Sequence, residues 1–216
     1  MNKIIGLAAQ LANGKDVVAN YLVQQLNLDV LYYEDKWRRL GFADAVKHVF
    51  MNSFGVDWDF IETWKRKDEI PDGFDLNVRK SLQFIGDGFR KIQSDIWIKT
   101  ALKNANGIIL SDVRYLNEIK AISDRGGINI LIWRKGYENN DPNPSESQIK
   151  PYVDFCLRNY KEGPLAGQIE PRDLDSGYGY DCLEYIDFFL KNDTDLEGLY
   201  AKIDTLVIPY LKMRGL

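Results

Sequence analysis

Hydrophobic residues gather in three short runs whose length and lack of alternation are typical of strands buried on both faces of a parallel sheet. These runs are Ile4–Ala8, Gly107–Leu110 and Ile128–Trp133. Apolar residues recur at helical spacing after the first run, in Val17–Leu26, and after the second, in Leu116–Ile122, which precedes the glycine pair 126–127. This alternation of strands and helices predicts a doubly wound α/β sheet.

The remaining chain divides into a helical region and two irregular ones. Within residues 44–106 the spacing predicts the helices Ala45–Phe54, Val78–Phe89 and Ile96–Asn104, and leaves Trp58–Asp75 open. Residues 136–147 have the composition of a loop, and residues 158–182 are rich in Gly, Pro, Tyr and Asp, which indicates an insertion or a mobile flap. An apolar strand ends near Lys191, and Leu196–Leu211 is a closing amphipathic helix.

Composition narrows the class of protein. The 216 residues, 45% of them hydrophobic, are enough for one sizeable core, and we expect a single domain over residues 1–216. The net charge of −4 disfavours a protein that coats nucleic acid through its phosphates. One histidine and two separated cysteines, Cys156 and Cys182, argue against a zinc site or a disulfide framework. With no apolar stretch long enough to span a bilayer and no signal-like start, we expect a cytoplasmic protein.

The segment that follows the first strand resembles a phosphate-binding loop, whose usual form is G-x-x-x-x-G-K-[ST]. Gly14 and Lys15 are in place, Ala9 replaces the first glycine, and Asp16 stands at the hydroxyl position. Backbone amides, a helix N-terminus and Lys15 would bind phosphate oxygens, and the Asp16 carboxylate is a suitable hard ligand for Mg²⁺, directly or through a water. The alternative is an ordinary strand, turn and helix, with Asp16 stabilised by the helix dipole.

A second candidate lies at the end of the second strand, where Asp112 is followed by Arg114. Ligands of open α/β sheets bind outside the carboxyl ends of the strands, so Asp112 would reach the metal and Arg114 a phosphate. The alternative is that Asp112 merely caps the next helix.

Two further groups are weaker candidates. A second nucleotide needs cations and flat side chains, although a solvated basic face with core aromatics explains the same residues. The residues of this group are Trp37, Arg38, Arg39, Phe42, Lys47, Gln83, Arg90 and Trp97. Near the C-terminus, Asn192 and Asp193 follow a strand and are placed to border a purine ring, unless Asp193 or Thr194 simply caps the following helix.

Together these motifs resemble the bacteriophage-type deoxynucleoside monophosphate kinases, a branch of the P-loop nucleotide kinases. The resemblance rests on "GKD" at 14–16, "FADAVK" ending at Lys47, "LQFIGDGFRK" at 82–91, Asp95–Trp97, "DVRYLNE" at 112–118, Ser145-Glu146 and Asn192–Leu199. Asn13 and Val17 stand where that family has Ser and Thr. The chain also departs from the family in having "NPSE" where a histidine often precedes the serine, and residues 158–182 match no family element.

The resemblance implies a P-loop fold with a five-stranded parallel sheet flanked by helices, a helical acceptor-binding region at 44–106, and a lid and insertion within 136–182. It implies Mg²⁺, ATP as phosphate donor, and phosphorylation of deoxynucleoside 5'-monophosphates to diphosphates. The residues assigned to catalysis are Lys15, Arg114, Arg134 and Asp112, and those assigned to the metal are Asp16 and Asp112. The residues assigned to ATP are Ala12, Asn13, Gly14, Lys15, Asp16, Val17, Asn192 and Asp193. The residues assigned to the acceptor are Trp37, Arg38, Lys47, Gln83, Arg90, Trp97, Asp112, Arg114 and Glu146.

Expected partners are small-molecule nucleotides and a second copy in a homodimer, with no stable nucleic-acid binding and no membrane. Two alternatives stay open. One is a P-loop kinase that phosphorylates a hydroxymethylated base within DNA, and the other is a nucleotide-binding module without turnover.

Overall fold

A computed structural model describes residues 3–28, 30–31, 36–103, 105–137, 147–169 and 183–216. The chain divides into two compact units. One, here called the sheet unit, comprises Met1–Leu40 and Ala105–Leu216, and the other, the helical unit, is Gly41–Asn104. The sequence pattern predicted mostly helix over residues 44–106, and the structure has four helices between Phe42 and Leu102.

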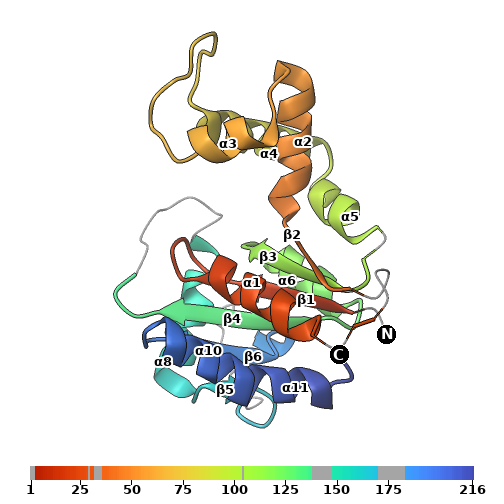
Figure 1. The fold of residues 1–216 in the computed structure, drawn as a ribbon, viewed down its shortest axis with the longest axis vertical. Helices are drawn as coiled ribbons and strands as arrows, with labels where there is room; N and C mark the ends of the chain where they lie inside the picture. Colours follow the sequence, from red (N-terminus) through yellow and green to blue (C-terminus); the bar gives the residue numbers. More distant parts are fainter. Residues whose placement is uncertain (1–2, 29, 32–35, 104, 138–146, 170–182) are drawn as a thin grey trace. The chain divides into compact units, whose positions relative to one another are not determined.

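The sheet unit contains a sheet in the order β2-β3-β1-β4-β6-β5 (Figure 1). The strands are β1 (Ile4–Ala8), β2 (Arg38–Leu40), β3 (Ile108–Val113), β4 (Ile128–Arg134), β5 (Gly163–Pro164) and β6 (Phe188–Asn192). The neighbouring strands in the series β2-β3-β1-β4-β6 all pair in the parallel sense, and β5 pairs with β6 in the antiparallel sense. The predicted five-stranded parallel sheet is therefore confirmed, with a two-residue strand added at one edge.

The register of β1 determines which side chains meet at the carboxyl edge of the sheet. All five residues of β1 are buried, as expected for a central strand covered on both faces. Its last residue, Ala8, pairs with Val113 of β3 and with Leu131 of β4. The loop after β1 and the residues that end β3 consequently share one edge of the sheet.

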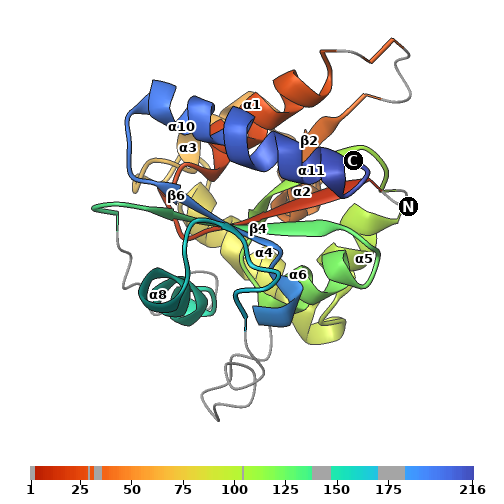
Figure 2. The ribbon, with the colours of Figure 1, turned by 90° about the horizontal axis from the view of Figure 1, so that it is seen from below.

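Helices cover both faces of this sheet (Figure 2). On one face lie α1 (Lys15–Leu26) and the C-terminal run of α10 (Leu196–Lys202), a π-helical segment (Ile203–Val207) and α11 (Ile208–Met213), whose apolar side chains join the main core. On the other face lie α6 (Leu116–Ser123) and α8 (Lys150–Asn159). The sequence did not predict α8, which lies inside the range assigned to the lid and insertion.

The helical unit consists of α2 (Phe42–Phe54), α3 (Trp58–Trp64), α4 (Val78–Ile92) and α5 (Ile96–Leu102). Its core is built on Phe50, Ile61 and Val78. The helix α3 lies in the stretch 58–75, for which the sequence pattern made no prediction. The few apolar residues of this short helix are too short a series to show a helical period. Within the described ranges, no helix combines the length and apolarity that a membrane span requires.

Candidate functional site

The turn from β1 into α1 has the backbone conformation of a phosphate-binding loop. Gly14, at the N-terminus of α1, has φ 88°, and Ala12 has φ 63°. The N-cap residue Gly14 makes no side-chain capping hydrogen bond, and the first amides of such a helix are suitable donors for an anion. Ala9 is fully buried and is not among the described residues with positive φ, which explains why alanine is tolerated where the usual pattern has glycine.

Two asparagines tie this loop to neighbouring strands. The buried Asn13 side chain accepts a hydrogen bond from the Arg134 amide at 2.6 Å and donates to the carbonyls of Leu11 and Tyr137 at 3.1 and 3.4 Å. The Asn192 side chain donates to the Asn13 carbonyl at 3.2 Å. The loop is thus anchored to the ends of β4 and β6, and its amides are held in place before any ligand binds.

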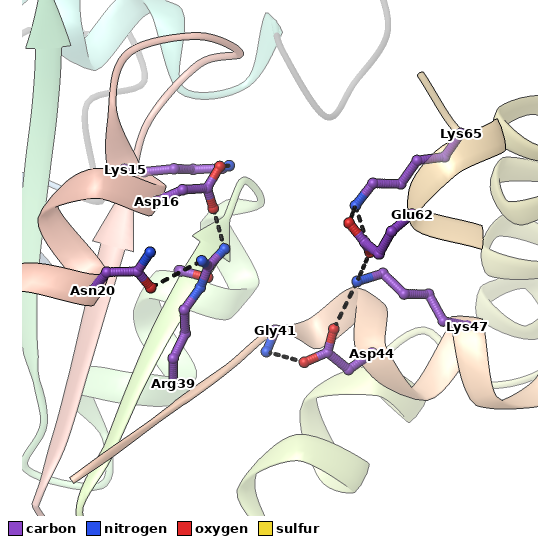
Figure 3. Close-up of polar contacts among 10 residues, drawn as sticks. Lys15, Asp16, Asn20, Arg39, Gly41, Asp44, Lys47, Glu62 and Lys65 are labelled. Carbon is purple, nitrogen blue, oxygen red and sulfur yellow. Dashed lines mark hydrogen bonds and ion pairs between the residues drawn. The ribbon is translucent and has the colours of Figure 1, made fainter. Parts of the chain in front are cut away.

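The charged side chains of the loop form a cluster (Figure 3). The Lys15 Nζ lies 3.0 Å from Asp16 Oδ2, and the other carboxylate oxygen of Asp16 contacts the guanidinium of Arg39. The Lys15 side chain is only 11% exposed, against 54% for Asp16. Two cations, Lys15 and Arg39, therefore neutralise the unusual carboxylate, and the predicted contact of Lys15 with phosphate stays a prediction.

The donor set at this edge fits Mg²⁺. Within the described ranges, no group of three or more histidine, cysteine, aspartate or glutamate side chains converges on one point. Mg²⁺ needs no such group, because it commonly keeps several waters and takes one or two carboxylates together with substrate phosphates. Asp16 in the first turn of α1 and Asp112 on β3 would supply such carboxylates, and both stay predictions as metal ligands.

The structure excludes the alternative that Asp112 merely caps the helix that follows it. Helix α6 is capped by Glu118, whose carboxylate accepts hydrogen bonds from the amides of Arg114 and Tyr115 at 2.8 and 3.1 Å. Asp112 lies within β3 and is not the N-cap of α6. Its half-buried position at the carboxyl edge is consistent with a role in ligand binding.

Arg134, predicted to act in catalysis, and Asp193, predicted to border ATP, lie at or just after the ends of β4 and β6. Arg134, at the end of β4, donates to the Ala12 carbonyl at 3.4 Å, and its guanidinium lies 3.9 Å from the centre of the Tyr137 ring. Asp193 pairs with Lys202 at 2.6 Å. Hydrogen bonding from Lys202 holds the pKa of the Asp193 carboxyl below its ordinary value.

The helix that follows Asp193 is capped by a different residue from those considered in the sequence. The Asp195 carboxylate accepts a hydrogen bond from the Gly198 amide at 2.8 Å. Neither Asp193 nor Thr194 is therefore the cap of α10, which leaves Asp193 in the strand-end loop that was predicted to border the purine. Val17, the last predicted ATP neighbour, lies in the first turn of α1 and is 38% exposed.

In the helical unit, Lys47 belongs to a cluster of charges (Figure 3). Its Nζ lies 3.0 Å from Asp44 Oδ1, 3.2 Å from Glu62 Oε1 and 4.2 Å from the centre of the Trp58 ring. Lys65 binds the same Glu62 carboxylate at 2.6 Å. Burial lowers the pKa of Lys65 despite the Glu62 carboxylate beside it. Two lysines therefore share one glutamate.

The remaining acceptor candidates separate by burial. Trp37 is 5% exposed in the core of the sheet unit, and Trp97 is 4% exposed and donates to the Gly86 carbonyl at 3.0 Å. Both positions favour structural roles, because neither ring presents a free face.

Arg38 and Gln83 are exposed, and Arg90 is half-buried with Asp87 3.4 Å away. Their contacts with an acceptor stay predictions. Ser145, Glu146 and Cys182 lie outside the described residues, as do residues 138–146 and 170–182 in full.

Sequence reasoning left some members of these clusters out of the predicted site. Arg39 was noted as part of a basic group but not as a partner of the phosphate loop, and Lys65 and Lys202 were not noted at all. The contact between Arg39 and Asp16 could not be predicted from their spacing in the sequence. The two residues meet because the folded sheet places β2 close to α1. The "WKRK" run at 64–67 was the one signal for Lys65, and it is equally typical of a solvated surface.

A parallel sheet with a central first strand, a loop with the sequence "GKD" after it and an aspartate on the neighbouring strand define the P-loop nucleotide kinase fold class. The resemblance to the deoxynucleoside monophosphate kinases is also confirmed. A curated protein of Acanthamoeba polyphaga mimivirus, named "Putative deoxynucleotide monophosphate kinase", is 29% identical over 181 residues, which are 73% of this chain and 89% of the relative. No family model matches the chain.

Two solved structures are also similar. A dephospho-CoA kinase from Campylobacter jejuni is 14% identical with a TM-score of 0.41, and each chain is covered completely. A sugar kinase from Janibacter sp. is 11% identical with a TM-score of 0.35, over 96% of this chain and 95% of that one. At these TM-scores neither neighbour bears on the substrate.

Proposed function

We propose that this chain is a phosphotransferase that uses Mg²⁺ and ATP to phosphorylate deoxynucleoside 5'-monophosphates. One observation carries the proposal: Ala8 and Val113 pair in adjacent parallel strands, so the "GKD" loop and the Asp112–Arg114 segment meet at one edge of the sheet. That edge is where open α/β folds bind their ligands. The similarity to the mimivirus relative supports the same class of substrate.

The residues suit phosphoryl transfer, which depends mainly on positioning and neutralisation of charge. The loop amides and Lys15 would bind the β- and γ-phosphate oxygens of ATP. Arg134, fixed at the end of β4 beside Ala12, and Arg114 would stabilise charge on the phosphoryl group during transfer. Asp16 and Asp112 would hold Mg²⁺, which when bound neutralises phosphate oxygens and orients them.

The acceptor would be bound through its own phosphate and base. Lys47 and Arg90 of the helical unit are the proposed ligands of the acceptor phosphate, and Lys47 is already held in an ordered cluster by Asp44 and Glu62. Binding of the acceptor near cations but away from bulk water would favour transfer over hydrolysis of ATP. The proposed lid, within residues 136–182, would serve this exclusion of water.

A coupled assay of ADP release tests the proposal. The panel contains the four deoxynucleoside monophosphates, their ribose counterparts and hydroxymethylated pyrimidine monophosphates, each with Mg²⁺-ATP. We expect ADP release that depends on at least one free deoxynucleoside monophosphate. Activity on an oligonucleotide with a hydroxymethylated base but on no free monophosphate would instead identify a DNA-base kinase, and ATP binding without transfer to any acceptor would identify a binding module.

A further inference from the structure

Arg39 bridges three elements of the sheet unit. From β2, its Nε donates to the Ser111 hydroxyl on β3 at 2.7 Å, and Nη1 donates to the Asn20 side-chain oxygen on α1 at 3.2 Å. Its Nη2 donates to Asp16 Oδ1. Ser111 is only 2% exposed, so one end of this network is fixed inside the protein. Figure 3 shows the guanidinium reaching from β2 toward Asp16 and Asn20.

The carboxylate of Asp16 poses an electrostatic problem for a loop that binds a polyanion. A usual phosphate loop carries one lysine and a neutral hydroxyl, with a net charge of about +1. Lys15 and Asp16 alone would cancel each other, and their 3.0 Å ion pair would have to break before Lys15 could bind phosphate. With Arg39 included, two cations and one anion restore a net charge of about +1.

We propose that Arg39 is a positioning residue of the nucleotide site: it neutralises Asp16 so that Lys15 is released to the triphosphate. This inference rests on the ATP binding in the proposed function. Among the described residues, the Lys15 side chain makes its polar contact with Asp16 alone, whereas Arg39 is also anchored by the neutral Ser111 and Asn20. When phosphate draws Lys15 away, the anchored guanidinium stays on Asp16 and prevents that carboxylate from repelling the nucleotide.

The geometry requires arginine rather than any cation. Three acceptors, Ser111 on β3 and both Asn20 and Asp16 on α1, are met by three different nitrogens of one planar group. A lysine at this position would carry the charge as a single point and lose the simultaneous contacts to Ser111 and Asn20. A lysine at position 39 would therefore leave Asp16 for the phosphate, as Lys15 does, instead of holding Asp16 in place.

The test is calorimetric ATP binding with EDTA and, separately, with Mg²⁺. Without Mg²⁺, Arg39→Ala leaves Asp16 to compete for Lys15, and we expect binding about tenfold weaker than in the natural protein. With Mg²⁺ the ion itself neutralises Asp16, so the loss should be several-fold smaller. Arg158→Ala removes an exposed arginine with one backbone hydrogen bond on α8, and should bind as the natural protein does in both conditions.

A double variant separates charge from structure. If Arg39 acts by neutralising Asp16, Asp16→Asn in the Arg39→Ala background should restore Mg²⁺-free ATP binding to within about threefold of the natural protein. Arg39→Gln serves the same comparison if Arg39→Ala fails to fold. Equal losses with and without Mg²⁺, or additive losses in the double variant, overturn the inference while the proposed function stands. Absence of ATP binding by the natural protein overturns both.

Discussion

The side-chain nitrogen of Asn192 lies 3.2 Å from the Asn13 carbonyl and 2.5 Å from where a Cβ at Gly14 would be. The end of β6 is thereby packed against the backbone of the phosphate loop, across 179 residues of sequence. Only a residue without a side chain fits at Gly14, and its φ of 88° imposes the same restriction. Loop geometry and strand-end geometry are consequently interdependent.

The first prediction concerns Gly14→Ala. The added methyl group must displace the Asn192 side chain, and the alanine must adopt a left-handed backbone conformation. We therefore expect a loss of about 1–3 kcal/mol in unfolding free energy and a marked loss of ATP binding. Gly55→Ala is the matched control, since Gly55 has φ 66° but no atom within 4 Å of its added Cβ. Thermal unfolding with ATP calorimetry should show destabilisation in both variants and loss of binding in Gly14→Ala alone; unimpaired ATP binding by Gly14→Ala would contradict the role of this contact.

The second prediction is that Lys15→Ala lowers turnover by about a hundredfold or more, because it removes the charge nearest the transferred phosphates. Lys120→Ala is the comparison, since it removes a lysine whose ion pair with Asp124 is exposed at the end of α6 and is screened by solvent. Steady-state ADP release measures both. Nearly full activity in Lys15→Ala would show that the loop is not the phosphate site.

The third prediction separates the acceptor from the donor. Lys65→Met should raise the KM for the acceptor monophosphate about tenfold and leave the KM for ATP unchanged, since Lys65 shares the Glu62 carboxylate with Lys47. Lys67→Met removes a lysine that instead lies over the Trp64 ring, 4.2 Å from its centre, and should change neither constant. An equal rise in both KM values for Lys65→Met would place the cluster outside acceptor recognition.

The fourth prediction concerns Lys202, which donates to Glu162, to the Lys191 carbonyl and to Asp193 at 2.9, 2.8 and 2.6 Å. Lys202→Met should cost about 1–3 kcal/mol of unfolding free energy at neutral pH, because it leaves these acceptors unpaired. Denaturant titration measures this loss. Thr205→Val, which removes a single hydroxyl bond to the Ala201 carbonyl, is a control expected to cost less.

The same network has a defined pH dependence. The pKa of Asp193 is lower in the folded protein than its ordinary 3.8, so its contribution to stability is complete above that value and is lost as the pH falls through the folded pKa. The difference in unfolding free energy between the natural protein and Asp193→Asn should therefore shrink below pH 3.8. A difference that is constant from neutral pH to pH 3 would contradict the ion pair.

The fifth prediction concerns the thiol of Cys156 on α8. Burial raises the pKa of this thiol to about 12, and its side chain is fully buried. Since the thiolate is the reactive form, we expect no alkylation of Cys156 in the native protein at pH 8 and full alkylation in denaturant. Mass spectrometry of the peptide that contains Cys156 reads the result, and rapid native labelling would show that α8 opens.

Much of the fold follows from local pattern. The apolar runs at Ile4–Ala8 and Ile128–Trp133 match β1 and β4 almost residue for residue, because burial on both faces leaves a signal within each strand. The helices α2 and α4 were likewise predicted to within three residues at each end. By contrast, α8 was missed because its buried residues Tyr152, Val153 and Cys156 form a short series beside a proline and polar residues.

By itself the sequence determined the order of strands and helices, the "GKD" loop with Lys15 and Asp16, and the motif that ends β3. Only the tertiary structure decided that β3 lies beside β1, that Asn13 and Asn192 join the loop to β6, and that Arg39 rather than Arg38 contacts Asp16. The physical reason is that burial imposes a period on neighbouring residues. Hydrogen bonds and ion pairs between distant segments impose none, since they depend on how the sheet brings separate strands together.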